Sequence, residues 1–181
     1  MTRTGKPRVL VLTSTFPRWQ GDATPRFVAD LSEGLTREGL DVTVLAPGSR
    51  GAARRELWGN VDVRRFQYSW PAATQRLADG AILPNIRANR LLALQAPPFV
   101  LAQLAAAWRL ARRERFDVIH AHWVVPQGLV AAMLKRTLGV PVITTTHGAD
   151  LFALRARPLL AAKRWALQSS DAITTVSDAL K

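Results

Sequence analysis

The sequence predicts an α/β domain in which a doubly wound parallel sheet of about six or more strands carries helices on both faces. Short apolar runs alternate along the chain with segments of helical spacing, as where residues 8–13 are followed by an amphipathic stretch from Phe27 to Leu35. These runs are continuously apolar and rich in β-branched residues, which is typical of strands buried on both faces. At 181 residues and 48% hydrophobic, the chain can bury one sizeable core, so we expect a single domain over residues 1–181.

Turn and capping residues bound each predicted element. After the first strand, Thr24 is expected to cap a helix that has Pro25 at its first position and Gly39 at its C-terminal end. Segment 48–60 has a loop composition, and 68–89 is interpreted as a long loop with short helical pieces, because proline and glycine interrupt its apolar residues. The remaining strands are expected at 41–46, 61–66, 116–123, 140–146 and 172–176, with the more polar 61–66 nearer an edge, and the remaining helices at 97–115, 127–138 and 158–169.

Composition narrows the class of protein. The chain has no cysteine, which excludes a disulfide framework and a thiolate metal site and suits a reducing, cytoplasmic location. The basic start, Met1 to Arg8, precedes an apolar run from Val9 to Leu12 that is too short for a signal peptide, and no apolar stretch approaches the roughly 20 residues needed to cross a bilayer. The net charge of +12 could attract phosphate-bearing partners or an anionic membrane. Alternatively, it reflects only a solvated, arginine-rich protein surface.

Unusual residues gather in the loops that follow the predicted strands. Ligands of doubly wound sheets bind beyond the carboxyl ends of the strands, so the loops after Thr13, His120 and Thr146 should meet at one edge. In the first loop a glycine allows close backbone approach, and the start of the next helix offers free N–H groups to an anion, although an ordinary turn with a packed tryptophan is the alternative. The candidate substrate-binding residues of this loop are Phe16, Arg18, Trp19, Gly21 and Asp22.

The three histidines of the chain follow or end two of the inner strands. His120 and His122 should point to the same face of their strand, with His120 as a hydrogen-bonded structural residue and His122, nearer the loop, in contact with ligand. His147 and Asp150 flank Gly148 after the next strand, where a neutral imidazole and a carboxylate can bind hydroxyl groups. Alternatively, Asp150 only caps a short helix.

Several chemistries have no support in the sequence. No carboxylate partners the histidines at metal-ligand spacing, so no metal site is expected. Nucleophile patterns of the Ser-His-Asp or Cys-His type, a Walker A loop and the G-x-G-x-x-G fingerprint are also missing. What remains is a set of polar groups that can position hydroxyls and phosphates.

Six segments of the chain form a recognisable series in their order and spacing, and they are Arg8-Val-Leu-Val-Leu-Thr-Ser-Thr-Phe-Pro17, Phe27-Val28, Gly39-Leu-Asp-Val-Thr-Val-Leu-Ala-Pro47, Asp117-Val-Ile-His-Ala-His-Trp123, Thr145-Thr-His-Gly-Ala-Asp150 and Asp171-Ala-Ile-Thr-Thr-Val-Ser177. In these segments the chain resembles the N-terminal, Rossmann-like domain of GT-B fold glycosyltransferases of the family 4 type. The resemblance implies a retaining transfer of a sugar from a nucleotide-sugar donor to a glycan, lipid or small-molecule acceptor, without a cofactor or metal.

The resemblance also assigns roles to residues. Gly21 is expected near the donor phosphates, His122 near the sugar and acceptor, and His147 with Asp150 along the cleft. His122 and His147 are the candidate catalytic residues, and the neighbouring candidates for substrate binding are Trp123, Gln127 and Gly148. The C-terminal donor domain, with its E-x7-E carboxylates, is expected to be absent from these 181 residues, so the isolated chain should be inactive.

Partners follow from the same resemblance and from the charge. We expect a C-terminal donor domain, a sugar or lipid-linked acceptor and an anionic membrane surface at the cytoplasmic face, contacted through 68–89 and the arginines between Arg109 and Arg115. A non-catalytic docking or carbohydrate-binding module remains an alternative. Nucleic acid is not expected as a partner, because the arginines are scattered and no nucleic-acid motif accompanies them.

Overall fold

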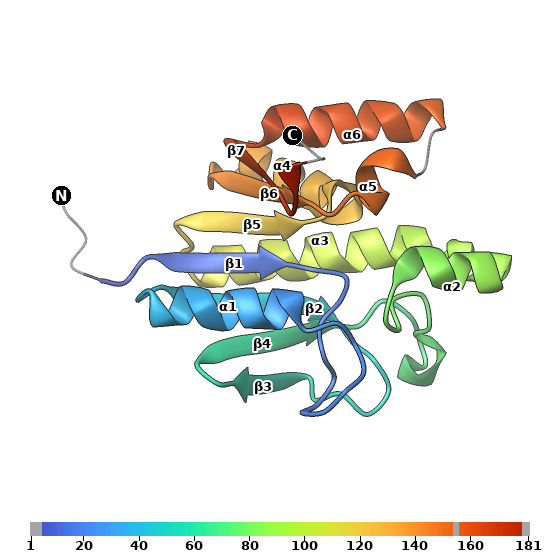
Figure 1. Cartoon of the computed structure of the whole chain (residues 1–181), viewed down its shortest axis with the longest axis horizontal. Helices are drawn as coiled ribbons and strands as arrows, with labels where there is room; N and C mark the ends of the chain where they lie inside the picture. The colour runs from blue at the N-terminus through green and yellow to red at the C-terminus, as the bar shows by residue number, and fades with distance from the viewer. Residues whose placement is uncertain (1–4, 154–155, 179–181) are drawn as a thin grey trace.

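The computed structural model, which describes residues 5–153 and 156–178, has the predicted doubly wound α/β architecture (Figure 1). In this described part, one sheet has the strand order β3-β4-β2-β1-β5-β6-β7, and its neighbouring pairs are parallel except for the antiparallel pair β3 and β4. The strands are β1 (Arg8–Leu12), β2 (Asp41–Pro47), β3 (Arg55–Trp58), β4 (Val61–Phe66), β5 (Val118–His122), β6 (Val142–Thr146) and β7 (Ala172–Thr175). The order reverses between β1 and β5, as the doubly wound class requires.

Strand β3 corrects the prediction of a loop over 48–60. It forms a hairpin with β4 in which Trp58 pairs with Val61 across the two-residue turn Gly59-Asn60, and Gly59 has a φ of +58°. Apolar and polar residues do not alternate clearly along β3, because Trp58 is its one buried residue and the apolar Leu57 is exposed. The usable signal was the glycine-asparagine pair, which favours two-residue hairpins. As expected for its polar composition, β4 lies next to the edge strand.

Helices cover both faces of the sheet. Val9 and Val11 of β1 pack with Val28 of the first helix on one face, whereas Leu10 and Leu12 point to the core beneath the later helices on the other. The α-helices are α1 (Phe27–Arg37), α2 (Ile82–Ala88), α3 (Ala96–Arg113), α4 (Leu129–Leu138), α5 (Ala149–Phe152) and α6 (Arg157–Ser169), and the other helical turns are η1 (Ala72–Thr74), η2 (Arg90–Gln95) and η3 (Val124–Gly128).

The boundaries of α1 differ at one end from the prediction. The helix begins at Phe27 after Arg26, without a side-chain cap, and the Thr24 side chain instead lines a pocket formed by the preceding loop. At the other end the prediction holds. Gly39 has a φ of +87°, and its amide bonds to Thr36 O while the Leu40 amide bonds to Leu35 O, the paired contacts of a Schellman motif.

The segment 68–89 contains the short helical pieces η1 and α2, as predicted, and η2 follows directly after it. One expectation was wrong. Because η2 runs directly into α3, the described chain has a 24-residue helical stretch, Arg90–Arg113, that is long and apolar enough by length and composition to cross a membrane. The uninterrupted apolar runs in this stretch are short, because Gln95 and Gln103 separate them without interrupting the helix. Residues 1–4 of the basic start lie outside the described part.

Candidate functional site

The candidate residues lie at the edge of the sheet where β1, β5 and β6 end. These strands are parallel and in register, with Leu12 opposite Ala121 and His122 opposite Thr145. Their carboxyl ends therefore point the same way, as the arrowheads of β1 and β5 show in Figure 1. The loops that follow them converge on one edge of the sheet.

Three histidines and two aromatic rings form a compact group at this edge, which we call the imidazole cluster. His120 and His122 do lie on the same face of β5, with ring centroids 4.5 Å apart. His122 Nδ1 is 3.1 Å from His147 Nε2, so the two rings share a hydrogen bond across β5 and β6. Trp123 stacks on His147 at 4.5 Å and 31°, and Phe27 packs against His147 at 5.0 Å. The members are His120, His122, Trp123, His147 and Phe27.

Burial holds the imidazoles of the cluster in the neutral form. Desolvation, with a smaller contribution from His147, lowers the pKa of His120 to about 4, and desolvation first and then the other two rings lower the pKa of His122 well below its usual value. Desolvation also lowers the pKa of His147, although Asp150 opposes this shift. A hydrogen bond between two imidazoles needs one N–H and one lone pair, so neutral rings suit this geometry.

The three rings differ in access. His122 is only 1% exposed, and its Nε2 has no partner within the described residues. His147 and Trp123 are half-buried, and Phe27 is 41% exposed. His120 makes the hydrogen bond expected of a structural histidine, from Nε2 to Thr145 Oγ1 at 2.7 Å. A ligand at this edge would therefore meet His147, Trp123 and Phe27 before His122.

Asp150 joins the loops after β5 and β6. Its Oδ2 accepts from the Val124 amide at 2.8 Å, and its Oδ1 accepts from the His147 amide at 3.0 Å. The side chain is buried, and both oxygens are occupied by backbone donors. Asp150 lies inside the first turn of α5, and Gly148, with a φ of +86°, holds the N-cap position, so the alternative that made Asp150 the cap is wrong. The carboxylate acts as a clamp between the two loops.

Trp123 has an unusual backbone conformation. Its φ is +73° and its ψ is 141°, and among the described residues it is the only non-glycine with a positive φ. Such a conformation costs about 1–3 kcal/mol and persists where neighbouring contacts impose it. The Trp123 amide donates to Thr145 O at 2.9 Å, and its carbonyl accepts from the Gly128 amide at 3.0 Å. These contacts and the stacking on His147 keep the indole in the cluster.

Two buried glutamines connect this cluster to the first loop. The orientation of the Gln127 amide that satisfies its neighbours has Nε2 donate to His122 O at 3.1 Å and Oε1 accept from the Ser14 amide at 3.2 Å. Gln103 of α3 donates to Thr13 O at 3.2 Å. Both side chains are fully buried. Gln127, a candidate for substrate binding, thus holds the ends of β1 and β5 together.

The first loop forms a second group along the same edge. Asp22 accepts hydrogen bonds from the Arg18 amide, from Nε and, at 2.6 Å, from Nη2, and this guanidinium holds the pKa of the buried carboxyl well below its usual range. Phe16 is buried and packs edge-on against Trp58. Trp19 is 44% exposed, and the Arg18 guanidinium lies 4.4 Å from its ring centroid.

Gly21 sits at the tip of this first loop. It has a φ of +83°, which favours glycine, and an added Cβ would meet nothing within 4 Å. The backbone is therefore open to an approaching group. The structure places Gly21 in the loop group, between Trp19 and Asp22, whereas the histidines, Trp123 and Asp150 form the other group.

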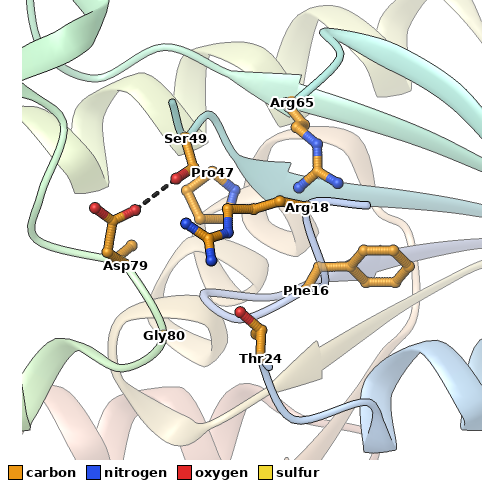
Figure 2. A pocket seen from close by; sticks show the side chains of 9 residues that line it. Phe16, Arg18, Thr24, Pro47, Ser49, Arg65, Asp79 and Gly80 are labelled. Carbon is orange, nitrogen blue, oxygen red and sulfur yellow. Dashed lines mark hydrogen bonds between the residues drawn. The ribbon is translucent and has the colours of Figure 1, made fainter. Parts of the chain in front are cut away.

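A pocket beside the loop contains residues that sequence reasoning missed. Figure 2 shows the Arg18 side chain pointing toward Ser49 and Asp79, whose side chains share a hydrogen bond of 2.5 Å, while Phe16 and Arg65 lie on the other side of the pocket. The Arg65 side chain is only 2% exposed and pairs with Glu56, so both arginines of the pocket already have carboxylate partners. Phe27, Gln103 and Thr145 were missed as well. Their contacts join segments far apart in the chain, and no local pattern marks them.

Within residues 5–153 and 156–178, no group of three or more His, Cys, Asp or Glu side chains is arranged to hold a metal ion. The residues of the cluster can therefore offer neutral hydrogen-bonding nitrogens beside aromatic faces. Sites of this composition, mostly aromatic with a few convergent polar groups, are typical of small-molecule binding.

Comparison with known proteins places this geometry in a family. The sequence profile of Glycosyltransferase Family 4 matches residues 24–181. N-acetyl-alpha-D-glucosaminyl L-malate synthase of Bacillus anthracis is 32% identical over 107 residues, which are 55% of this chain and 28% of the relative. The putative teichuronic acid biosynthesis glycosyltransferase TuaC of Bacillus subtilis is 26% identical over 149 residues, which are 80% of this chain and 37% of the relative. The matches thus span well under half the length of either relative.

A solved structure supports the fold. The catalytic domain of starch synthase IV from Arabidopsis thaliana, bound to ADP and acarbose, superposes with a TM-score of 0.61 over 96% of this chain and 45% of its own, at 15% identity. The likeness confirms the Rossmann-like, GT-B type architecture expected from the sequence. With its profile match over most of its length, the chain belongs to Glycosyltransferase Family 4.

Proposed function

We propose that the chain is the acceptor-binding, N-terminal half of a retaining glycosyltransferase that moves a sugar from a nucleotide-sugar donor to a glycan, lipid or small-molecule acceptor. Its 181 residues alone do not catalyse the transfer, because the donor half is supplied by another domain. The observation that carries the proposal is the neutral imidazole cluster, in a family 4 domain, at the edge where doubly wound sheets bind ligands.

Each member of the cluster has a distinct task in this proposal. The faces of Trp123 and Phe27 pack against the C–H groups of a sugar ring, and the second ring nitrogen of His147 bonds a hydroxyl group. His122 holds His147 in one tautomer through the shared hydrogen bond. Because both rings are neutral near pH 7, they orient hydroxyls without adding charge. Direct contact of His122 with ligand requires the rings that bury it to shift.

The cluster supplies positioning and hydrogen bonds and does not supply a nucleophile. The Asp150 carboxylate beside it has both oxygens engaged by backbone amides. The reacting sugar is therefore held by the donor domain and presented to an acceptor bound at this edge. Retention of anomeric configuration follows the resemblance to the family, and the configuration of the product tests it directly.

Two relatives suggest acceptors to try first. One is named as the synthase of N-acetyl-alpha-D-glucosaminyl L-malate, and the other as a putative glycosyltransferase of teichuronic acid biosynthesis. A hydroxy acid and an oligosaccharide acceptor therefore belong in the panel with a lipid-linked sugar. The donors are UDP-, GDP- and ADP-sugars, scored by release of the nucleotide.

The experiment compares the kinetics of variants made in the complete enzyme, which includes the donor domain. We expect His147→Ala to lower kcat/KM by about a hundredfold or more, the range for a positioned acid–base or hydrogen-bonding group, and Trp123→Ala to raise KM for the acceptor. Leu57→Ala, on the exposed face of the edge strand β3, is the matched control and should leave both unchanged.

Three outcomes would contradict the proposal. Wild-type turnover in both His147→Ala and Trp123→Ala would remove the cluster from the acceptor site. Saturable acceptor binding without transfer from any donor would indicate a carbohydrate-binding module. Loss of activity with a chelator would contradict the expectation that no metal takes part.

A further inference from the structure

The outer face of the stretch Arg90–Arg113 is apolar where a surface helix is normally polar. Its inner face packs into the core through Phe99, Ala107 and Leu110. On the opposite face Leu94, Leu101 and Trp108 are 75%, 65% and 40% exposed. They recur every seven residues, a spacing that returns to the same side of a helix. With the exposed residues between them they form what we call the outer stripe, composed of Leu94, Pro98, Leu101, Ala105 and Trp108.

Arginines flank the outer stripe and no acidic residue accompanies it. From Gly80 to Arg113 the sequence contains five arginines and neither aspartate nor glutamate. Arg87 and Arg90 are exposed before the stripe, and Arg109, Arg112 and Arg113 are exposed at its end. The Arg112 guanidinium lies 4.9 Å from the centroid of the Trp108 ring. The surface is therefore apolar along its middle and positive at both ends.

A further tryptophan lies in the loop tied to the start of this stripe. Trp70 is 87% exposed, and it precedes η1. Gln95, at the junction of η2 and α3, donates to Thr74 O at 2.8 Å and accepts from the Leu77 amide at 3.2 Å. These bonds attach the loop to the helix. Tryptophan beside exposed leucine is typical of surfaces that enter the boundary between water and lipid.

We propose that the outer stripe docks on an anionic phospholipid bilayer, with α3 lying in the interface and its arginines on lipid phosphates. Crossing the bilayer would expose the core, because α3 covers the sheet through Phe99 and Ala107. Lying on the surface keeps that packing. Only 17% of the most apolar 18-residue segment of this helical stretch is buried, whereas an ordinary core helix is mostly buried.

The charge of this surface favours an anionic bilayer over a second copy of the chain as its partner. In a symmetric pair of such helices, either orientation brings one arginine-bearing end close to another, and residues 80–113 contain no carboxylate to compensate. Anionic headgroups complement both ends at once. Each arginine near such a surface adds to binding in a salt-dependent manner.

Docking would also orient the imidazole cluster. The helix α3 connects the β4 side of the sheet with β5 and runs opposite to the parallel strands, so the Leu94 end of the stripe lies toward the edge where β1 and β5 end. In Figure 1, α2 lies beyond the arrowhead of β1. An acceptor anchored in the membrane could then reach this edge. That consequence rests on the proposed function, whereas the docking itself does not.

Vesicle sedimentation of the full chain tests the proposal. We expect binding to phosphatidylcholine vesicles with about one third phosphatidylglycerol, little binding to pure phosphatidylcholine, and release at high salt. The double variant Leu94→Gln/Leu101→Gln should weaken binding at least about tenfold, because two leucines no longer enter the interface. Leu57→Gln is the control, since Leu57 is 76% exposed on β3 and lies outside the stripe.

A second variant separates folding from docking. The triple change Arg109→Gln/Arg112→Gln/Arg113→Gln should weaken binding to anionic vesicles by about fivefold for each arginine and reduce the salt dependence. Absence of wild-type binding to anionic vesicles, or equal binding of wild type and both variants, would overturn the proposal. A wild-type dimer that the double leucine variant converts to monomer, without vesicle binding, would assign the stripe to a second copy instead. Sugar transfer is not measured, so this result and that for the proposed function are independent.

Discussion

Removal of the Asp150 carboxylate should destabilise the chain more than the loss of an ordinary surface charge. In Asp150→Ala, the buried amide of Val124 and the half-buried amide of His147 both lose their acceptor. A buried donor left without a partner costs about 1–3 kcal/mol. Because the His147 amide can regain water more readily, we expect the free energy of unfolding to fall by about 2–4 kcal/mol.

Urea unfolding followed by circular dichroism at neutral pH measures this loss. Asp30→Ala is the matched control, because Asp30 is 60% exposed in its side chain and its pair with Arg26 belongs to the class that contributes at most about 1 kcal/mol. Asp150→Asn should fall between the two, since its amide keeps one acceptor oxygen but sets an NH2 group against a backbone N–H. If Asp150→Ala costs no more than Asp30→Ala, the carboxylate is not a clamp.

Two further perturbations test the electrostatics of the edge. The pKa of His120 in the folded chain, about 4, lies below the value near 6.5 of an unfolded histidine. The contribution of the neutral His120 ring to the free energy of unfolding is therefore fully present above about pH 6.5 and is lost as the pH falls toward 4. Between pH 7.5 and pH 5, His120 alone should lower the free energy of unfolding by about 2 kcal/mol, and urea midpoints that do not change would contradict the burial argument. Asp22→Asn leaves Arg18 without its carboxylate, and we expect a loss of about 1–3 kcal/mol, reduced from the cost for a buried pair because Arg18 is one-third exposed. A double-mutant cycle with Arg18→Ala measures this coupling, and additive losses would contradict it.

Local sequence patterns were sufficient for most of the elements. Continuous apolar runs identified β1, β2, β5 and β6, because burial on both faces leaves no polar alternation. The more polar β4 and the edge strand β7, whose residues are mostly exposed, were identified as well. Gly39 marked the end of α1, where its positive φ is required. The pattern failed at β3, whose only buried side chain is Trp58, and at Thr24, which turns into the loop pocket instead of capping α1. Both failures arise from contacts made outside the segment itself.

The histidines were placed at the correct edge for a physical reason that the sequence contains. Alternating strands and helices force the strands to run parallel, so residues at their carboxyl ends must meet. The sequence therefore determined the fold class, the family and the edge at which His122, His147 and Asp150 lie. It could not determine what these side chains touch.

Only the tertiary structure decided which groups a ligand would meet. The contacts of Asp150 with Val124, of Gln127 with Ser14 and of Phe27 with His147 each join different loops, and their geometry depends on how the loops pack. The exposed stripe on α3 was likewise invisible, because an apolar helix has the same sequence pattern whether its second face is buried or bare. Periodicity records which residues share a face, while the neighbours that cover that face are chosen by long-range packing.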